Sequence, residues 1–545
     1  MGHTTYLEAA GAGALSVRRA VQGKRLLVTG VTGFLGKVWL AHLLQNAPDV
    51  AEVIVLIRPK KGESASARLD RIIERSPAFR ALRDAHGEGY ERFVRGKLRG
   101  VEARLTQPLA GLGADAAPLL ADIDAVVHFA GLTDFEPDPL MALDANVRGA
   151  RHAADLAALS RGRIYLHVST AFVAGVDTDD VREHIERGLA PNGVRFSPER
   201  ELQDLEAELG RLERKQDRID ACMARAQRLG WPNVYTYTKG LAEHLLEGRQ
   251  DVRAATFRPS IVECALSYPF TGWNEGVNTS GPIVWLLGTS FQRFPARAEN
   301  VFDIAPVDTA ARRLSLVLAA QLAGERDAVG VYTCASGTVN PFTFGRAVEM
   351  TGLAQRRLHR GSGDRWRRNV VSRLDAVCFG VQDEQAFGHA RLRRLARATR
   401  SWLRENPPKE QLSPRMHRKL GGRRLDDNVR SCSMKCRTAD RKLGQIDDML
   451  RQYRPFIHDH DYRFRTERLA ALSERLAPGE REAFAFDVAD IDWRHYWMDV
   501  EVPGLETWSI PILRGEKVPE DEPRVVANAR RTRSPRYGRS VDAAE

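Results

Sequence analysis

The chain of 545 residues is poor in cysteine and has no long apolar run. Its six cysteines are scattered, and only Cys432 and Cys436 lie close together, without histidines at the spacing that zinc sites use. No window approaches the ~20 consecutive apolar residues of a membrane-spanning helix, and the N-terminal segment lacks the residue order of a signal peptide. The sequence therefore predicts no disulfide framework, no metal site and no transmembrane helix, and it favours a cytoplasmic protein.

Lysine is also scarce. The chain contains 12 Lys but 70 Arg, and its formal net charge is +11. Residues 351–430 hold 20 Arg or Lys and 8 Asp or Glu, so this region accounts for the whole excess of positive charge. Three interpretations stay open: a solvated surface, a site for a polyanion such as coenzyme A, and a peripheral contact with an anionic membrane. No nucleic-acid partner is expected, and the oligomeric state is left open.

Apolar segments alternate with helical patterns over about residues 23–345. Because such alternation places helices on both faces of a parallel sheet, the sequence predicts an α/β fold: a Rossmann-type doubly wound parallel sheet with a mainly helical C-terminal domain. Five segments rich in Val, Ile and Leu are the expected buried strands: Arg25–Thr29, Val53–Ile57, Ala125–Phe129, Ile164–Val168 and Ala255–Phe257.

Four segments follow from this pattern. They are an N-terminal extension over 1–22, the α/β domain over 23–345, the helical domain over 346–513 and a disordered tail over 514–545. A helical insertion interrupts the α/β domain at about 196–230, and we expect one long amphipathic helix or a helical arm packed on the core. Its apolar residues follow helical spacing: Leu202, Leu205, Leu209, Leu212, Ile219, Met223 and Ala226.

The first candidate site is a glycine-rich turn after the first expected strand. Gly30 permits a sharp turn, Gly33 lets the backbone approach a pyrophosphate, and Gly36 lets helix and sheet pack closely. The helix that follows would face the phosphates with its free N–H groups. This strand-to-helix context predicts dinucleotide binding. The expected contacts are Thr29, Gly30, Thr32, Gly33, Phe34, Leu35 and Gly36.

The end of the second expected strand indicates which dinucleotide is bound. Enzymes that use NAD place a carboxylate there for the ribose 2′-hydroxyl, whereas this chain has Arg58, Lys60 and Lys61. A guanidinium group can form a planar fork on a 2′-phosphate. The sequence therefore favours NADPH, held by Arg58 and Lys60; a solvated basic turn is the alternative.

A second candidate site combines two motifs. Ser169-Thr170 ends the strand Ile164–Val168, and Tyr235 precedes Lys239 by four residues, which places both on one face of a helix. A tyrosine hydroxyl, with an ordinary pKa of ~10, is brought toward neutrality by a neighbouring ammonium and a nicotinamide cation. It can then donate a proton to a carbonyl oxygen, to which Thr170 can also hydrogen-bond.

In this order, the glycine-rich turn, Ser169-Thr170-Ala171 and Tyr235–Lys239 resemble an extended short-chain dehydrogenase/reductase. Finer matches resemble the fatty acyl-CoA reductase (male-sterility) family over about residues 23–345, and weaker matches extend into the C-terminal region. These finer matches are Val28–Val38, Leu56–Lys60, His167–Val173, Asn233–Lys239, Phe257–Val262, Ala335–Pro341, Phe486–Val488, Ile491–Tyr496 and Gly504-Leu505.

The resemblance implies an NADPH-dependent reductase of long-chain fatty acyl-CoA, giving the aldehyde and then the alcohol. It implies catalytic positions for Thr170, Tyr235 and Lys239, whereas His128 and Asn146 are expected to be structural. The chain departs from the family in one place: the usual Gly-Asp after the third strand, at the adenine, is absent from Arg99–Thr106. Further cofactor contacts are expected from Ala130, Gly131, Ser169, Pro259 and Ser260.

Three alternatives are kept open. A sugar-nucleotide epimerase or dehydratase shares the fold, although an acid usually stands where Arg58 does. A reductase for thioesters on carrier proteins would belong to a larger modular chain. A catalytically silent nucleotide sensor would not need Thr170, Tyr235 and Lys239. For the reductase, we expect the acyl tail to lie at the seam between residues 345–510 and the α/β domain, because each buried methylene contributes ~0.8 kcal/mol.

Overall fold

The computed structural model describes most of the chain. Residues 1–12 of the expected N-terminal extension, Lys61 and residues 520–545 of the expected tail lie outside the described residues. The described residues are 13–60, 62–289, 291–325, 327–360, 373, 375–379, 389–407, 411, 413–419 and 423–519.

A seven-stranded sheet forms the centre, in the order β10-β6-β5-β4-β1-β2-β3. All neighbouring strands are parallel. The order reverses between β1 and β4, and open α/β sheets bind ligands at the carboxyl ends of the strands beside such a reversal. The Rossmann-type fold is therefore confirmed. The strands are β1 (Arg25–Thr29), β2 (Glu52–Ile57), β3 (Leu98–Glu102), β4 (Ala125–His128), β5 (Ile164–Val168), β6 (Arg253–Pro259) and β10 (Gly330–Cys334).

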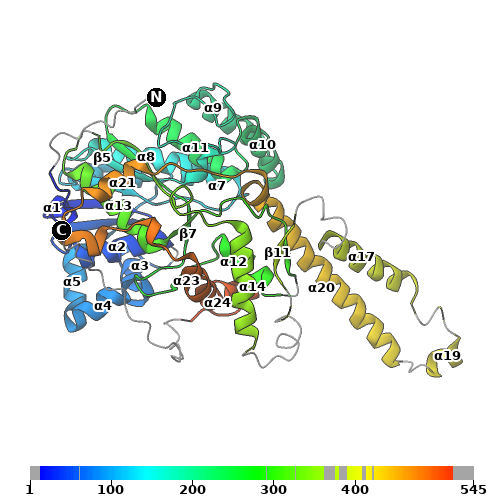
Figure 1. The fold of residues 1–545 in the computed structure, drawn as a ribbon. Coiled ribbons are helices and arrows are strands. Elements are labelled where there is room, and N and C mark those ends of the chain that lie inside the picture. The colour runs from blue at the N-terminus through cyan, green and yellow to red at the C-terminus, as the bar shows by residue number, and fades with distance from the viewer. Residues whose placement is uncertain are drawn as a thin grey trace, which may run out of the picture.

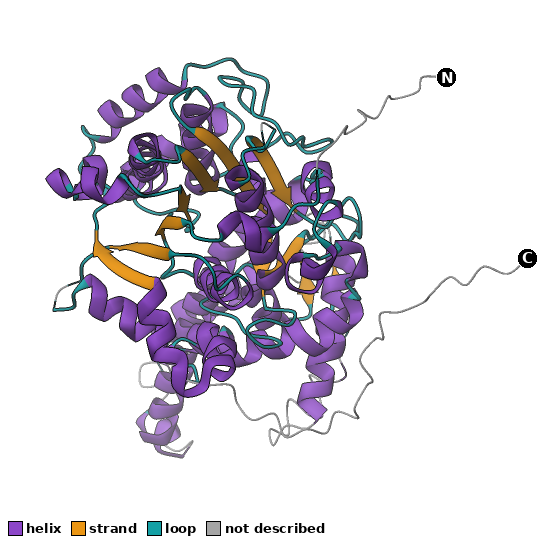
Figure 2. Cartoon of the chain, turned by 90° about the vertical axis from the view of Figure 1, so that its left-hand side faces the viewer, coloured by secondary structure: helices purple, strands orange, loops and turns teal. Residues whose placement is uncertain are grey.

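Helices cover both faces of this sheet, and Figure 2 shows the strands enclosed between them. Along β1, Leu26 and Val28 join the core on one face, whereas Leu27 joins the core on the other, as the two-residue period of a strand requires. The first face carries α2 (Phe34–Asn46) and α13 (Val307–Leu322). The second carries α8 (Gly149–Leu159) and α11 (Val234–Glu247). Shorter helices of this part are α1 (Val17–Val21), α3 (Ala65–Arg75), α4 (Arg80–His86), α5 (Tyr90–Lys97), α6 (Ala116–Leu120), α7 (Pro139–Ala142) and α12 (Ser280–Leu287).

The insertion forms two helices rather than one. Helix α9 (Pro198–Leu209) ends at Gly210, and α10 (Lys215–Arg228) begins after a short turn. Their apolar faces join the core beside α11, with Leu205, Leu209 and Cys222 fully buried. The insertion is thus packed on the body of the protein.

The C-terminal part is mainly helical and packs into the body at several places. Leu469 and Trp508 join the core on the α2 and α13 face of the sheet. Helices α17 and α20 instead extend away from the body as a hairpin (Figure 1). No described helix is both long and apolar enough to cross a bilayer. The elements of this part are α14 (Phe344–Arg360), α17 (His389–Glu405), α19 (Pro414–Lys419), α20 (Arg423–Arg454), η9 (Pro455–Asp459), α21 (Glu467–Glu474), α22 (Arg481–Phe484), α23 (Trp493–His495), η12 (Tyr496–Glu501), α24 (Val502–Trp508) and α25 (Ile510–Arg514).

Short strand pairs complete the fold. The strand β7 (Ile261–Glu263) pairs with β9 (Ile304–Pro306), and β8 (Arg293–Phe294) pairs with β11 (Val377–Cys378). β7 follows β6 after Ser260, so it leads the chain from the carboxyl end of β6 toward the C-terminal helices.

Candidate active site

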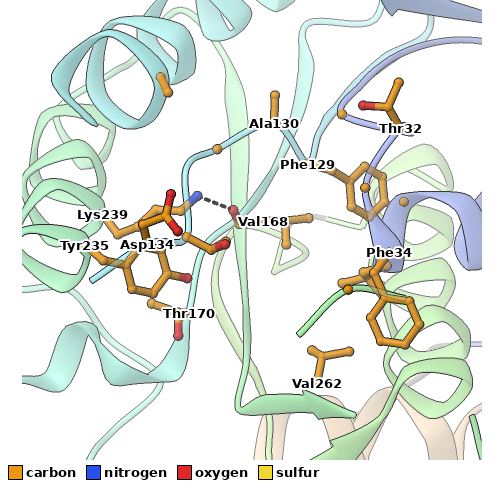
Figure 3. A pocket seen from close by; sticks show the side chains of 18 of the residues that line it. Thr32, Phe34, Phe129, Ala130, Asp134, Val168, Thr170, Tyr235, Lys239 and Val262 are labelled. Atoms are coloured by element: carbon orange, nitrogen blue, oxygen red, sulfur yellow. Dashed lines mark hydrogen bonds between the residues drawn. The ribbon is translucent and has the colours of Figure 1, made fainter. Parts of the chain in front are cut away.

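A cleft of about 1030 Å³ opens at the carboxyl ends of β1, β2, β4, β5 and β6. Figure 3 shows Thr170, Tyr235 and Lys239 on one side of it and the glycine-rich turn on the other. The structure therefore brings the two sequence motifs to one cavity. The residues from the sequence prediction that line it are Gly30, Thr32, Gly33, Phe34, Leu35, Gly36, Arg58, Ala130, Gly131, Ser169, Thr170, Tyr235, Lys239, Pro259 and Ser260.

Two residues expected at the cofactor do not line this cleft. Thr29 is fully buried, and its hydroxyl lies 2.8 Å from Nδ1 of His128, so its side chain joins the sheet interior. Lys60 is exposed and forms an isolated bridge with Glu63, because the chain turns at that point. Lys61 lies outside the described residues.

The glycine-rich turn fits a dinucleotide. Gly30 has a φ of +76°, and a Cβ there would lie 2.4 Å from the Ala130 nitrogen. A Cβ on Gly36 would lie 2.8 Å from the Gly30 oxygen. Gly33 is the N-cap of α2, and no side chain caps that helix end. Its N-terminal N–H groups are thus available to a phosphate in the cleft.

Three guanidinium groups line the far end of the cleft: Arg58, Arg68 and Arg104. Arg68 also donates to the backbone oxygen of Arg58 at 2.8 Å, which ties α3 to the end of β2. Arg68 and Arg104 are site residues that the sequence did not predict. Arg104 belongs to the stretch that lacks the usual Gly-Asp, so this departure puts a cation at the cleft.

Tyr235 and Lys239 lie one turn apart on α11, as the spacing predicts. Asn233 fixes the start of this helix, because its Oδ1 accepts the Thr236 N–H at 2.8 Å. Lys239 Nζ donates to the Val168 oxygen at 2.8 Å, which links the helix to the end of β5 (Figure 3). Thr170 follows β5 and lies close enough to the Tyr235 hydroxyl to lower the pKa of Tyr235.

The electrostatics of this trio differ from the expectation. Burial raises the pKa of Tyr235 to about 12, although the Thr170 hydroxyl opposes this shift. Burial lowers the pKa of Lys239 to about 8, and the carboxylate of Glu243 opposes that shift. The protein alone therefore does not bring the tyrosine toward neutrality, because the effect of burial exceeds that of the Thr170 hydroxyl. The Lys239 ammonium donates to the Val168 oxygen instead.

Asn146 connects the segments that surround the trio. Asn146 accepts the Leu132 N–H at 2.7 Å and donates to Thr238 on α11 at 3.0 Å, so it joins the loop after β4 to that helix. A Cβ on Gly131 would lie 3.1 Å from Asn146 Oδ1 and 3.3 Å from Lys239 Nζ. A side chain at that position would therefore require Asn146 and Lys239 to shift by a few tenths of an ångström.

An aromatic wall borders the trio. The Phe135 ring lies 6.4 Å from the ring of Tyr235, 5.3 Å from that of Tyr453 and 5.4 Å from that of Phe456. Phe172 completes it, 5.3 Å from Phe456. All four phenyl rings of the wall line the cleft, and Tyr453 and Phe456 come from the end of α20 and from η9. No local pattern in the sequence points to these residues.

Comparison with known proteins identifies the family. Residues 28–314 match the family model of an NAD-binding domain described as male sterility protein, and residues 425–510 match a second model with the same description. The chain belongs to the male sterility protein family. It is thus an oxidoreductase with a site for a nicotinamide dinucleotide, as the resemblance implied.

Three relatives carry the name fatty acyl-CoA reductase. The chloroplastic fatty acyl-CoA reductase 2 of Arabidopsis thaliana is 28% identical over 512 residues, covering 90% of this chain and 79% of that protein. The probable fatty acyl-CoA reductase 4 of the same plant is 28% identical and covers 89% of this chain and 97% of that protein. Fatty acyl-CoA reductase 1 of Mus musculus is 31% identical and covers 61% of each chain.

A solved structure shows the same fold. The reductase domain of a non-ribosomal peptide synthetase from Mycobacterium tuberculosis aligns with a TM-score of 0.52 and 16% identity, covering 92% of this chain and 95% of that chain. At this identity the likeness concerns the fold alone.

Proposed function

We propose that this protein reduces long-chain fatty acyl-CoA with NADPH, to the aldehyde and then to the fatty alcohol. The observation that carries the proposal is one cavity that combines a dinucleotide turn, the Thr170, Tyr235 and Lys239 trio and an aromatic wall. Membership of a family whose relatives are named fatty acyl-CoA reductases supports the substrate class.

The cleft has a fitting group for each part of NADPH. The N-terminus of α2 at Gly33 would hold the pyrophosphate. Arg58, Arg68 and Arg104 would hold the 2′-phosphate and flank the adenine, because guanidinium groups form charge-assisted forks with phosphate. Lys239 would bind the nicotinamide ribose. NADPH, when bound, supplies hydride to a carbonyl carbon.

Side chains of the protein would stabilise and protonate the carbonyl oxygen of the substrate. Tyr235 and Thr170 would hydrogen-bond the oxygen as negative charge develops on it, and Tyr235 would donate the proton. In the first reduction, the tetrahedral adduct loses the thiol of coenzyme A and leaves the aldehyde. In the second, the protonated oxygen stays as the alcohol. With NADPH bound, Lys239 would favour the ionised tyrosine by its positive charge.

The aromatic wall is the proposed site for the first part of the acyl chain. Its rings lie beside the Tyr235 ring, so a thioester at the tyrosine would place its chain against Phe135 and Phe456. Phe456 and Tyr453 belong to the C-terminal part, whereas Phe135 follows β4. This is the seam between residues 345–510 and the α/β domain that the sequence analysis proposes for the tail.

Replacing one hydroxyl tests the reaction. Tyr235→Phe should lower the rate of NADPH oxidation with long-chain acyl-CoA by about 10²–10⁴-fold, because it removes the proton donor and little volume. NADPH affinity should stay unchanged. Mass spectrometry over a panel of chain lengths identifies aldehyde and alcohol.

A matched control is Tyr332→Phe, which removes a hydroxyl that donates to the Asp327 oxygen at 3.2 Å on the edge strand β10. This variant should keep the wild-type rate. A loss of less than about tenfold in Tyr235→Phe would exclude Tyr235 as the proton donor.

The choice of NADPH is tested at Arg58. Arg58→Ala should weaken NADPH binding by one to two decades, since a charge-assisted fork contributes ~1.5–3 kcal/mol. NADH lacks the 2′-phosphate, so its dissociation constant should not change. Titration of both cofactors measures this difference, and an unchanged NADPH constant would refute the assignment of Arg58.

A further inference from the structure

The excess positive charge of the protein lies on one hairpin. We define the arm as helices α17, α19 and α20, which lie within the sequence range 389–454; these helices extend away from the body (Figure 1). This range contains 19 Arg or Lys and 7 Asp or Glu, whereas the rest of the chain contains 63 and 64. The arm therefore carries the whole net charge of the protein.

Few of these cations stabilise the hairpin itself. Arg393 pairs with Asp440 and Asp447 at 3.1 and 2.8 Å, and Arg397 pairs with Asp440 at 2.7 Å, which ties α17 to α20. Other cations of the two helices are exposed and have no ion-pair partner among the residues that the structure describes. They include Arg394, Arg404, Lys435, Arg437 and Arg441.

The arm also exposes large apolar side chains among these cations. Met434, Leu395 and Trp402 are 66%, 62% and 61% exposed, the highest values for large apolar residues in the described part of the chain. Leu395 and Trp402 are seven residues apart, so they share one face of α17. Met416 on α19 is 55% exposed. The apolar groups thus occur along the arm and at its far end.

We propose that the arm docks on the surface of an anionic phospholipid bilayer. Clustered Arg and Lys are attracted to anionic headgroups, and interleaved Trp, Leu and Met can enter the boundary between headgroups and acyl chains. The two kinds of side chain are both needed, because exposed cations alone are consistent with a solvated surface.

The shape of the arm favours a bilayer over an acidic carrier protein. Helix α20 has 32 residues and so spans ~48 Å, from the far end of the arm to Tyr453 at the cleft. A carrier that delivers a thioester to Tyr235 would sit at the cleft end and leave Met416 and Trp402 uncovered. A bilayer covers the arm along its length.

Docking would also bring the cleft close to the source of its substrate. Tyr453 and Phe456 at the base of the arm line the proposed acyl site. This consequence rests on the proposed function, whereas docking itself does not and is measured without turnover.

Sedimentation with vesicles tests docking of the full-length protein. We expect binding to vesicles of phosphatidylcholine with phosphatidylglycerol, and little binding to phosphatidylcholine alone. Raising the salt from about 0.1 M to about 0.5 M should weaken binding, because exposed charges are then screened. Brominated lipids should quench the fluorescence of the wild type more than that of Trp402→Phe.

Charge-reversal variants test whether the arm is the surface that binds the vesicles. The combined variant Arg394→Glu, Arg404→Glu, Lys435→Glu and Arg437→Glu should lower the partition coefficient at least about 100-fold, since each cation contributes about fivefold. Circular dichroism and the rate with a short-chain acyl-CoA should match the wild type. The control variant makes four reversals at exposed arginines of the body and should bind as the wild type does: Arg75→Glu, Arg92→Glu, Arg151→Glu and Arg211→Glu.

Three outcomes would overturn the proposal. They are absence of binding to anionic vesicles, equal binding by the arm and control variants, and binding of an acidic acyl carrier protein by a chain that does not bind vesicles. Vesicle binding by a chain that lacks reductase activity would leave docking intact and refute only the proposed function.

Discussion

At the scale of single residues, the charge of Lys239 depends on the buried carboxylate of Glu243. Glu243 lies one turn along α11 and is 2% exposed. Arg258 on β6 donates from Nε to both of its carboxylate oxygens at 3.1 Å. Burial lowers the pKa of Lys239 to about 8, and the Glu243 carboxylate opposes this. Glu243, held in place by Arg258, therefore helps to keep the ammonium charged.

Glu243→Gln tests this dependence, because the amide oxygen still accepts from Arg258 while the charge is lost. The pKa of Lys239 should fall below about 8. If the ammonium is the active form, the rate falls as the pH rises through this pKa. We therefore expect the alkaline limb of the kcat/KM profile to move down by about one pH unit or more.

Glu247→Gln is the matched control, one further turn along α11. Burial raises the pKa of Glu247, and the charge of His184 lowers it. Glu247 is not among the groups that shift the pKa of Lys239. Its pH profile should follow the wild type. An alkaline limb that does not move in Glu243→Gln would show that Glu243 does not keep Lys239 charged.

Local spacing determines which site residues the sequence could predict. Tyr235 and Lys239 were predictable because four residues make one helical turn, and Thr170 because it ends a strand. Arg104 and Tyr453 line the cleft through tertiary packing, and no local pattern in the sequence shows that. Their roles as binding or catalytic groups stay predictions.

At the scale of elements, two glycines of the turn between β1 and α2 have different roles: Gly30 in stability and Gly33 in cofactor binding. Gly30→Ala should lower the free energy of unfolding by about 2 kcal/mol or more, since a left-handed conformation costs a non-glycine residue ~1–2 kcal/mol and its Cβ would lie 2.4 Å from Ala130 N. Urea denaturation measures this change.

Gly33→Ala is the partner variant. Gly33 has a φ of −91°, and a Cβ there would meet nothing closer than the Gly30 oxygen at 3.4 Å. The loss of stability at this N-cap should stay within about 1 kcal/mol. The methyl group should nevertheless weaken NADPH binding more than about tenfold, because it occupies the space of the pyrophosphate. Equal losses of stability in both variants would contradict this separation.

Strands with continuous apolar burial were predictable, whereas edge strands were not. β1 and β5 have the bounds that the sequence predicts. β3 lies at the edge of the sheet. Its Arg99 and Glu102 are exposed and its Gly100 is partly buried, so its composition does not resemble that of a buried strand. The insertion has the predicted apolar spacing, but it breaks after Leu209, where Gly210 is the C-cap of α9.

At the scale of the whole molecule, the fold class was predictable because alternating strands and helices permit few topologies. The way in which the C-terminal part folds back was not. Tyr496 and Trp497 are fully buried, and Ser509 donates to the Gly276 oxygen at 2.7 Å in a loop that lines the cleft. Contacts between segments more than 200 residues apart leave no local signal in the sequence.

Two buried carboxyl groups meet at this junction. Glu263 at the end of β7 accepts the Ser280 N–H at 2.8 Å. Glu501 at the end of η12 accepts the Cys264 N–H at 3.1 Å and the Tyr496 hydroxyl at 3.0 Å. The second oxygen of each carboxyl has no donor among the described residues, and the two side chains contact each other. Burial and the charge of Glu501 raise the pKa of Glu263, so the pair favours a state in which the two carboxyls share a proton.

This shared proton predicts a stability that falls as the pH rises. Burial raises the pKa of Glu501 to about 7, from 4.5 in an unfolded chain, so the folded protein binds more protons than the unfolded chain between these values. In Glu501→Gln the amide donates to Glu263 in place of the proton. Relative to wild type, the variant should therefore gain about 3 kcal/mol of stability as the pH rises through this window. Urea denaturation at several pH values measures the difference, with the exposed Glu482→Gln as a control that should show none. A pH dependence in Glu501→Gln equal to that of the wild type would show that the two carboxyls do not share a proton.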